Sequence, residues 1–262
     1  MCGIAGYSLD EGSTVDRTLA AQALLAGIAE RGADAVGYAH RGAGPRVTIH
    51  KQRSGATALL EAVELPPDAT EALVHVRDYT KGHPTVLANN HPIRHGSVVG
   101  IHNGIIVNDE EIFARYGIAR AEPEMTVDSE AIFALMHVAR SDHTLLEELR
   151  GSMATAWIDE RTPDRVHLAR GVARPLWIGR TRRELFFAST KAALDVVEGA
   201  LRLTLRKQEI AEGRLLHLER GRIATETRFR ADRSYRDDKA LPAVRAAHEG
   251  ASCLAKLATL TA

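Results

Sequence analysis

Apolar and polar residues follow two spacings along the chain, and each spacing predicts one kind of element. The stretch GIAGYSL, which begins at Gly3, is a short apolar run typical of a buried strand. Residues 14–30 place Leu19, Leu24 and Ile28 at helical spacing, and Gly32 then ends the predicted helix. The chain is therefore expected to open with a strand followed by a helix.

The same mixed order continues up to residue 150. The stretches ALVHVR and GSVVGIHNGII predict strands, the second running into an Asn-Gly turn, and GYAHRGAGPRVTIHKQ predicts two strands joined by a Gly/Pro turn. The stretches NDEEIFARYG and DSEAIFALMHVARS predict amphipathic helices, and the second has an acidic first turn that favours a helix start.

After residue 150 the pattern changes to a meander of short apolar runs separated by glycine, proline and charged turns, which predicts antiparallel sheet. Residues 230–262 differ again, since a charged segment precedes an apolar stretch that predicts one or two helices. Strands gathered around a few helices predict an α+β protein with sheets and helices in separate layers.

Length, charge and cysteine content limit the number of domains and the kinds of binding partner to be expected. The 262 residues suit one large domain, and Lys+Arg and Asp+Glu both number 34, so the formal charge is +0. No global field draws the chain to nucleic acid or to an anionic membrane, and neither partner is expected. No apolar run predicts a membrane span or a signal peptide. Two cysteines form no disulfide framework, which favours a reducing compartment, with the cytoplasm as the expected location.

Cys2 stands directly after the initiator methionine. Removal of Met1 would leave a thiol and an α-amine on one residue, with pKa values of about 8.5 and about 8. The amine can then accept the thiol proton without a separate histidine, which predicts a nucleophile. The alternative is an ordinary small buried residue.

The local sequence does not decide the roles of the other polar residues that are candidates for the site. Asn103 and Gly104 can donate hydrogen bonds to an oxyanion, or form a plain hairpin turn. Arg77 can clamp a carboxylate or form a surface ion pair, and Asp128 can accept from an ammonium or cap a helix. Arg31 and Asp34 are expected to be structural and paired with each other. Five histidines crowd this region, but their spacing fits no compact metal motif, and no metal is predicted: His75, His83, His91, His95 and His102.

Several stretches together resemble the class II glutamine amidotransferases, which belong to the N-terminal nucleophile hydrolases. They are MCGIAGY, RGADAVGYAH, HVRDYTKGHPTVLANNHPI, GIHNGIIVN and TVDSEAI, followed by ARGVARPLWIG, ELFFAST and QEIAEGRLLHLERGRI. The resemblance covers residue 2 to about residue 225. It implies a four-layer αββα sandwich of two antiparallel sheets flanked by helices, with a glutaminase domain at 2–229 and a helical extension at 230–262.

The resemblance also implies roles for individual residues. Cys2 would attack the side-chain amide of L-glutamine, and the Asn103 side chain with the Gly104 N–H would stabilise the oxyanion. Four further residues would bind the substrate or orient a loop beside it: Arg77, Thr80, His91 and Asp128. No metal or organic cofactor is needed for this half-reaction. Asp78, Tyr79 and Lys81 depart from the family pattern in the loop that covers the substrate.

The ammonia released would pass to an acceptor. Only about 37 residues follow the similar stretches, so a separate synthase is expected, docked through the terminal apolar residues Leu241, Val244, Leu254, Leu257 and Leu260. The alternative for this segment is packing on its own domain. Other readings of the whole chain are a free-standing amidohydrolase acting on a larger γ-glutamyl amide, another N-terminal cysteine acylase, and a non-catalytic regulatory subunit.

Overall fold

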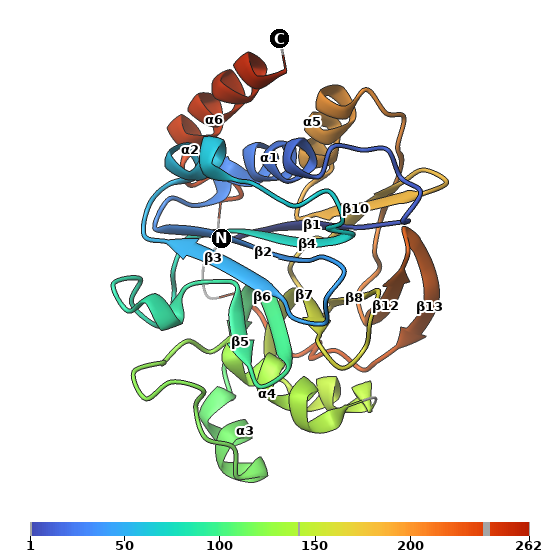
Figure 1. Ribbon diagram of the computed structural model, residues 1–262. Coiled ribbons are helices and arrows are strands. Elements are labelled where there is room, and N and C mark those ends of the chain that lie inside the picture. The colour runs from blue at the N-terminus through green and yellow to red at the C-terminus, as the bar shows by residue number, and fades with distance from the viewer. Residues whose placement is uncertain (1, 141, 238–241, 262) are drawn as a thin grey trace.

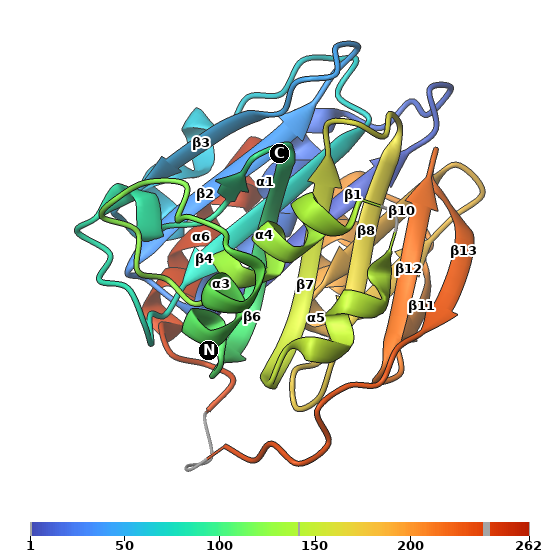
Figure 2. The ribbon, with the colours of Figure 1, turned by 90° about the horizontal axis from the view of Figure 1, so that it is seen from below.

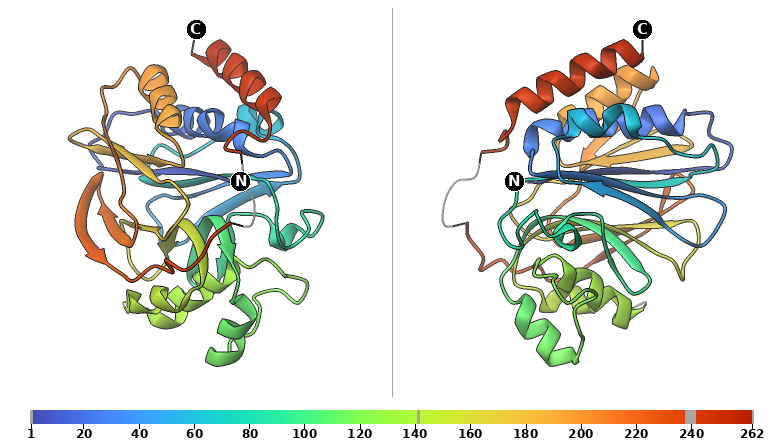
Figure 3. Two further views of the ribbon diagram at one scale, coloured as in Figure 1. Left: turned by 180° about the vertical axis from the view of Figure 1, so that it is seen from behind. Right: turned by 60° about the vertical axis from the view of Figure 1, so that its left-hand side comes forward.

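Two antiparallel sheets lie face to face between two layers of helices (Figure 1). This is a computed structural model, and it describes residues 2–140, 142–237 and 242–261. One helical layer covers the outer face of the first sheet and the other covers the outer face of the second sheet (Figure 3). The predicted α+β fold, a four-layer αββα sandwich, is confirmed.

The first sheet has seven strands within the described ranges, in the order β11-β9-β10-β1-β4-β2-β3. Its central strand β1 is buried along its whole length, as its apolar sequence predicts. The strands are β1 (Gly3–Leu9), β2 (Ala35–Arg41), β3 (Thr48–Gln52), β4 (Glu71–Arg77), β9 (Trp177–Arg180), β10 (Glu184–Ala188) and β11 (Arg206–Glu209).

The second sheet has six strands among the described residues, in the order β13-β12-β8-β7-β6-β5. Strands β6 and β7 pair along nine positions and form its middle together with β8. The strands are β5 (Ile93–His95), β6 (Val98–Ile106), β7 (Gly151–Asp159), β8 (Arg165–Arg170), β12 (Arg214–Glu219) and β13 (Arg222–Arg228).

The helices divide between the two outer faces (Figures 1 and 2). On the side of the first sheet lie α1 (Arg17–Ile28), α2 (Ala56–Leu59), α5 (Lys191–Leu201) and α6 (Ala247–Leu260). On the side of the second sheet lie α3 (Asp109–Tyr116) and α4 (Glu130–Ala139). Short 3-10 helices are η1 (Ala29–Arg31), η2 (Leu60–Ala62), η3 (Leu87–Asn89) and η4 (His143–Glu148). The part of the chain described here contains no helix long and apolar enough to cross a bilayer.

Apolar side chains between the sheets form the innermost core. Ile4 of β1 and Leu73 of β4 meet Val99 and Ile101 of β6 there. Side chains alternate between the two faces of a strand, so residues two positions apart point the same way. Cys2 and Asn103 therefore share the inner faces with Ile4 and Ile101, in the space between the sheets.

Two predictions of secondary structure were wrong. Asn103 and Gly104 do not form a turn, because they lie inside β6, opposite Ala154 and Met153 of β7. The meander after residue 150 is interrupted by α5, which begins after Thr190, whose hydroxyl accepts from the Ala193 N–H at 3.2 Å. Pairing with β7 overrides the local turn preference of Asn-Gly.

The helix α6 packs back on its own domain, against α1, α2 and η1. Cys253 and Leu257 are buried in this contact, and the Glu249 carboxylate accepts from the Thr57 N–H at 3.0 Å. Val244, Leu254 and Leu260 remain exposed, and Leu241 lies outside the described residues. Docking of a partner on the exposed residues stays a prediction.

Candidate active site

Cys2 immediately precedes β1, at one end of the central strand. Gly3 pairs with Val76 of β4, and the register continued by one residue places Cys2 opposite Arg77. The Cys2 thiol donates to the Asp78 carbonyl oxygen at 3.5 Å, and Arg31 Nε donates to the Cys2 carbonyl oxygen at 2.9 Å. The residue is therefore held on both sides, with its sulfur beside the segment that leaves β4.

The environment of Cys2 keeps its thiol protonated. Burial raises the pKa of the Cys2 thiol, and the nearby Arg77 guanidinium lowers it by a smaller amount. A thiolate nucleophile in this position consequently needs a base. The α-amine of Cys2 is the base that the sequence predicts. Met1 lies outside the described residues.

Asn103 supplies a hydrogen-bond donor that no other described residue uses. Its side chain is buried, and its Nδ2 has no hydrogen-bond partner among the described residues. An unpaired buried amide donor costs about 1–3 kcal/mol, so native folds seldom keep one without a function. The side chain shares its face of β6 with Ile101, which turns it toward the first sheet.

Gly104 follows with a backbone that only glycine adopts readily, at a φ of +151°. A Cβ atom here would lie 2.0 Å from the Ser152 carbonyl oxygen and 2.6 Å from His102 Nε2. The close approach of β7 therefore requires glycine at this position. Unlike Asn103, Gly104 is only half-buried, so its peptide borders accessible space.

A histidine contact joins the two sheets beside these residues. His75 Nε2 of β4 lies 3.2 Å from the His102 carbonyl oxygen of β6. Because a carbonyl oxygen only accepts, His75 carries its proton on Nε2. His75 is two residues before Arg77 and His102 is next to Asn103. The contact thus brings the Arg77 end of β4 to the Asn103 position of β6.

Arg77 is buried and organises the segment that follows β4. Its NH1 donates to Asn90 Oδ1, and its NH2 donates to the Lys81 carbonyl oxygen at 2.9 Å and to the Gly82 carbonyl oxygen. Burial lowers the pKa of Arg77, while Cys2 and Asp128 raise it through their charges. The alternative of a surface ion pair is wrong, since the guanidinium lies inside, between the nucleophile candidate and an acid.

Asp128 does not cap the helix that follows it. Its Oδ2 accepts from the Ile106 N–H of β6 at 2.7 Å, and Ser129 occupies the position before α4. Burial raises the pKa of Asp128 to about 6, and the Asp109 carboxylate adds to this shift. The carboxylate therefore lies near the end of β6 that carries Asn103 and Gly104, and it couples electrostatically to Arg77.

The other two predicted site residues differ in exposure. Thr80 is exposed in the loop after β4. His91 is buried and stacks on His75, with ring centroids 4.2 Å apart, and neither ring nitrogen of His91 has a hydrogen-bond partner among the described residues. Burial and the neighbouring His75 hold the pKa of His91 well below its ordinary range. The His91 ring is therefore neutral and packs against His75, whose hydrogen bond to the His102 carbonyl oxygen joins the two sheets.

Residues 78–83 form the site loop, which is held at several points. The Tyr79 N–H donates to Asp34 Oδ2 at 2.9 Å. Lys81 Nζ pairs with the Asp109 carboxylate of α3 at 2.6 Å. Two of the three departures from the family pattern, Asp78 and Lys81, thus make ion pairs with other parts of the fold.

Some residues around the site were misread or missed in the sequence. The expected Arg31–Asp34 pair is wrong, because Arg31 donates to Cys2 and Asp34 accepts from the site loop. Asn90, which holds Arg77, and Arg174, which makes a two-pronged contact with Asp237 at 2.7 Å, were not singled out. Both side chains are buried, but the sequence alone does not distinguish a buried asparagine or arginine from an exposed one.

Comparison with known families and curated proteins identifies relatives. A sequence profile described as a glutamine amidotransferase domain matches residues 83–196. A glutamine–fructose-6-phosphate aminotransferase (isomerizing) of Rhizobium meliloti is 31% identical over 205 residues, covering 74% of this chain and 32% of the relative. The corresponding protein of Vibrio parahaemolyticus is 30% identical over 232 residues, covering 84% and 36%. The chain spans about a third of the length of these relatives.

Solved structures share the fold. The glutamine phosphoribosylpyrophosphate amidotransferase of B. subtilis superposes with a TM-score of 0.68 at 22% identity, over 87% of this chain and 49% of that chain. A glutamine aminotransferase class-II domain protein from Silicibacter pomeroyi gives a TM-score of 0.54 at 18% identity, over 87% and 99%. At these identities the likeness concerns the arrangement of sheets and helices.

Proposed function

This chain carries a class II glutamine amidotransferase domain, and on that premise we propose that it hydrolyses L-glutamine to L-glutamate and ammonia with Cys2 as nucleophile. The observation that carries the proposal is the buried, unpartnered Nδ2 of Asn103, on the β6 face turned toward the sheet that bears Cys2. A donor fixed in advance where negative charge develops is what an amide-cleaving site needs.

The first step forms a covalent bond to sulfur. The α-amine of processed Cys2 takes the thiol proton, and the thiolate attacks the Cδ of glutamine. The carbonyl oxygen becomes an oxyanion, which accepts from Asn103 Nδ2 and from the Gly104 N–H. Collapse of this intermediate breaks the C–N bond. Ammonia leaves with the proton from the α-ammonium, and a γ-glutamyl thioester remains.

The second step restores the thiol. Water loses a proton to the α-amine of Cys2 and attacks the thioester carbonyl, through an oxyanion held by the same two donors. The C–S bond then breaks, the thiolate regains its proton, and glutamate leaves. A reducing compartment, as expected from two unpaired cysteines, suits a nucleophile that must stay a thiol.

Two buried side chains carry charges complementary to the α-carboxylate and the α-ammonium of glutamine. Arg77 would bind the α-carboxylate and Asp128 the α-ammonium, because both are buried and each affects the charge state of the site. Thr80 in the site loop would add a hydroxyl contact, and His91 would orient the loop. These assignments place the amide of glutamine between Cys2 and Asn103.

We also propose that the ammonia passes to a separate synthase. The names of the relatives, an aminotransferase and an amidotransferase, support transfer of nitrogen rather than its loss. The exposed apolar residues Val244, Leu254 and Leu260 are the predicted contact of the partner. Pull-down of the full chain, followed by a glutaminase assay with and without the recovered protein, tests this step. A stimulated rate that Leu254→Ala abolishes supports it, and an unchanged rate contradicts it.

The hydrolytic function is tested with purified full-length protein. Ammonia and glutamate should appear in equal amounts from L-glutamine, and Cys2→Ala should abolish both. Cys253→Ala is the control, because it removes the other thiol, which lies on the buried face of α6, and should leave turnover intact. Intact-mass measurement should find the chain beginning at Cys2. Full activity with Met1 retained, or activity in Cys2→Ala, would overturn the mechanism.

One alternative substrate has a structural reason. The ion pairs of Asp78 and Lys81 give the site loop partners that the family pattern does not imply. A larger γ-glutamyl amide would use the same Cys2, Asn103 and Gly104. Comparing kcat/KM for glutamine with that for γ-glutamyl amine conjugates separates the two substrates, and a higher value for a conjugate assigns the chain to the amidohydrolases.

A further inference from the structure

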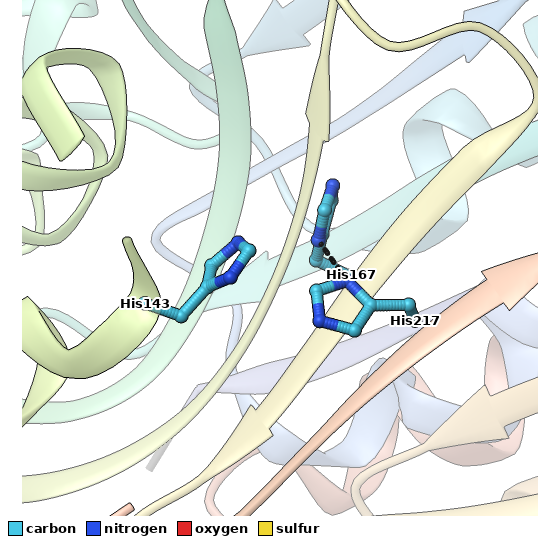
Figure 4. A group of neighbouring side chains, drawn as sticks. All are labelled: His143, His167 and His217. Carbon is cyan, nitrogen blue, oxygen red and sulfur yellow. Dashed lines mark hydrogen bonds between the residues drawn. The ribbon is translucent and has the colours of Figure 1, made fainter. Parts of the chain in front are cut away.

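Three histidines from three separate elements converge on the outer side of the second sheet (Figure 4). His143 comes from η4, His167 from β8 and His217 from β12. We propose that this His143–His167–His217 cluster binds a divalent first-row transition-metal cation such as Zn²⁺, as a structural clasp between η4 and the two strands. The cluster shares no residue with the five histidines between residues 75 and 102.

The geometry of the three rings suits one shared ligand. Each histidine offers a ring nitrogen, and the three nitrogens lie within 4.8 Å of one another. His167 and His217 are direct cross-strand neighbours, and their Nδ1 atoms are 2.8 Å apart. The ring of His143 lies 4.7 Å from that of His217 and 5.5 Å from that of His167, centroid to centroid. Figure 4 shows the three rings turned toward one common space.

A bound cation requires only small movements. Zinc–nitrogen bonds of about 2.0–2.1 Å in a tetrahedral site place two ligand nitrogens about 3.3 Å apart. The His167–His217 contact would open by about 0.5 Å, and His143 would approach by at most about 1.5 Å. Since His143 is half-buried at the start of a short 3-10 helix, a side-chain rotation supplies this movement.

The rings are in the protonation state that a metal needs. Burial lowers the pKa of each of the three histidines, that of His217 to about 4, so all are neutral at pH 7. Their close packing would repel any proton that charged one of them. In addition, the buried Nε2 of His167 has no hydrogen-bond partner among the described residues. The cluster therefore holds neutral imidazole nitrogens that the protein itself leaves incompletely bonded.

The surroundings favour a cation and fix the ligands. Trp157 of β7 stacks on His167, with ring centroids 4.9 Å apart and planes 4° from parallel, which holds that ring in one orientation. Asp142 raises the pKa of His143 and Glu219 raises that of His217, so negative charge lies near both. Arg165 acts in the opposite direction, but its guanidinium is paired with Glu219.

The donor set decides the type of metal. Imidazole nitrogen suits Zn²⁺, Co²⁺, Ni²⁺ and Cu²⁺, whereas Mg²⁺ and Ca²⁺ prefer oxygen ligands. The fourth position of a three-histidine site would be filled by water. Joining η4 to β8 and β12 would stabilise the fold by linkage, because the unfolded chain does not bring residues 143, 167 and 217 together.

Binding is measured in a Cys2→Ala background, so that the active-site thiol cannot ligate the metal. The probes are Zn²⁺ by calorimetry and Co²⁺ by its visible absorption. We expect one equivalent of each metal to bind, the cobalt spectrum of a tetrahedral site, and a rise of several degrees in Tm. His248→Gln, which removes an exposed histidine outside the cluster, is the control and should bind like the parent.

The double variant His167→Gln/His217→Gln should lose saturable binding. Because those two positions are buried, the single variant His143→Gln serves as a second test, with at least tenfold weaker binding expected and the unliganded Tm little changed. Absence of stoichiometric binding in the parent protein would overturn the proposal. Unweakened binding in His143→Gln or in the double variant would equally overturn it.

Discussion

Arg245 and Asp78 join the C-terminal segment to the site loop by an ion pair, with Arg245 Nε 3.1 Å from Asp78 Oδ2. The backbone N–H groups of Arg245 and Ala246 both donate to the Glu30 carbonyl oxygen, at 2.8 and 2.9 Å. The Asp78 carbonyl oxygen also accepts from the Cys2 thiol, so Asp78 contacts both the segment that leads into α6 and the candidate nucleophile.

Arg245→Gln should change substrate binding more than stability. The Arg245 side chain is 44% exposed, so the pair contributes at most about 1 kcal/mol to folding. A looser site loop should raise KM for glutamine about two- to fivefold, equivalent to less than about 1 kcal/mol, with kcat preserved. Arg46→Gln breaks the ion pair of an exposed arginine with Glu160, elsewhere in the fold, and is the matched control. Equal KM values in both variants would contradict a role of Arg245 in holding the loop.

Asn103→Ala should lower kcat about 100- to 1000-fold with little change in KM, because only the oxyanion uses its amide. Its thermal stability should be unchanged or higher, since the Nδ2 that it removes has no hydrogen-bond partner among the described residues. Asn108→Ala is the converse control. That side chain bonds the Glu148 carbonyl oxygen and the Arg150 N–H, so its loss should lower Tm and spare kcat. Steady-state kinetics and thermal melts of both variants give the comparison.

Asp128→Asn should stabilise the fold at neutral pH. The pKa of Asp128 is about 6 in the folded chain and near 3.8 when unfolded, so the folded state holds this proton more tightly. Stability therefore falls as pH rises from about 4 to about 6, and the ionised group costs about 3 kcal/mol above that range.

Asparagine keeps an acceptor for the Ile106 N–H without that cost. Urea unfolding should show the variant more stable than the parent at pH 7.5, and show no such gain at pH 4. An identical difference at the two pH values would refute the assignment. In activity assays the same variant should raise KM, because the substrate ammonium loses its carboxylate.

Gly104→Ala should be far more damaging than Gly117→Ala. Both glycines have positive φ, +151° and +62°, so both substitutions carry backbone strain of about 1–2 kcal/mol. Of these two, Gly104 is the one where the new methyl group would meet another atom closely, whereas no atom of the described residues lies within 4 Å of a Cβ at Gly117. Denaturant titrations should therefore show an additional loss of at least about 2 kcal/mol at Gly104.

Leu257 and Leu254 test the two faces of α6 with one residue type. Leu257 is 5% exposed, and Leu257→Ala should cost about 2–4 kcal/mol of unfolding free energy. Leu254 is 42% exposed, and Leu254→Ala should cost less than about 0.5 kcal/mol. A large loss at Leu254 in the isolated protein would mean that the outer face of α6 already has a partner, such as a second copy of the chain.

Sequence patterns predicted the elements whose burial is regular. The apolar run from Gly3 became β1, and the acidic start before residue 130 became α4. The helix α5 was missed because its surroundings read as strands. A cap at Thr190 and buried residues at Ala193, Leu194 and Val197 were the available signal.

The candidate site was predictable as a set of residues but not as an arrangement. Asn-Gly favours a turn locally, yet pairing with β7 places it in a strand. Asp128 has the position of a helix cap, yet its carboxylate bonds Ile106, 22 residues earlier in the chain. Such contacts depend on how sheets and helices meet, which the local pattern does not contain.

The histidine cluster illustrates the same limit over longer separations. His143, His167 and His217 show no motif spacing, and only the pairing of β8 with β12 and the position of η4 bring them together. A metal site of this kind can therefore be recognised only from the three-dimensional structure.

The contacts of Arg77 imply a form of self-competition. Its guanidinium already binds the Lys81 and Gly82 carbonyl oxygens, two neutral acceptors supplied by the loop itself. If Arg77 holds the substrate carboxylate, the substrate must replace these loop carbonyl oxygens. The measured binding free energy is then the difference between the free energy of the Arg77–carboxylate contact and that of the contacts within the loop. A change that straightens the loop away from Arg77 would then tighten binding while removing contacts from the unliganded protein, so affinity and rigidity would move in opposite directions.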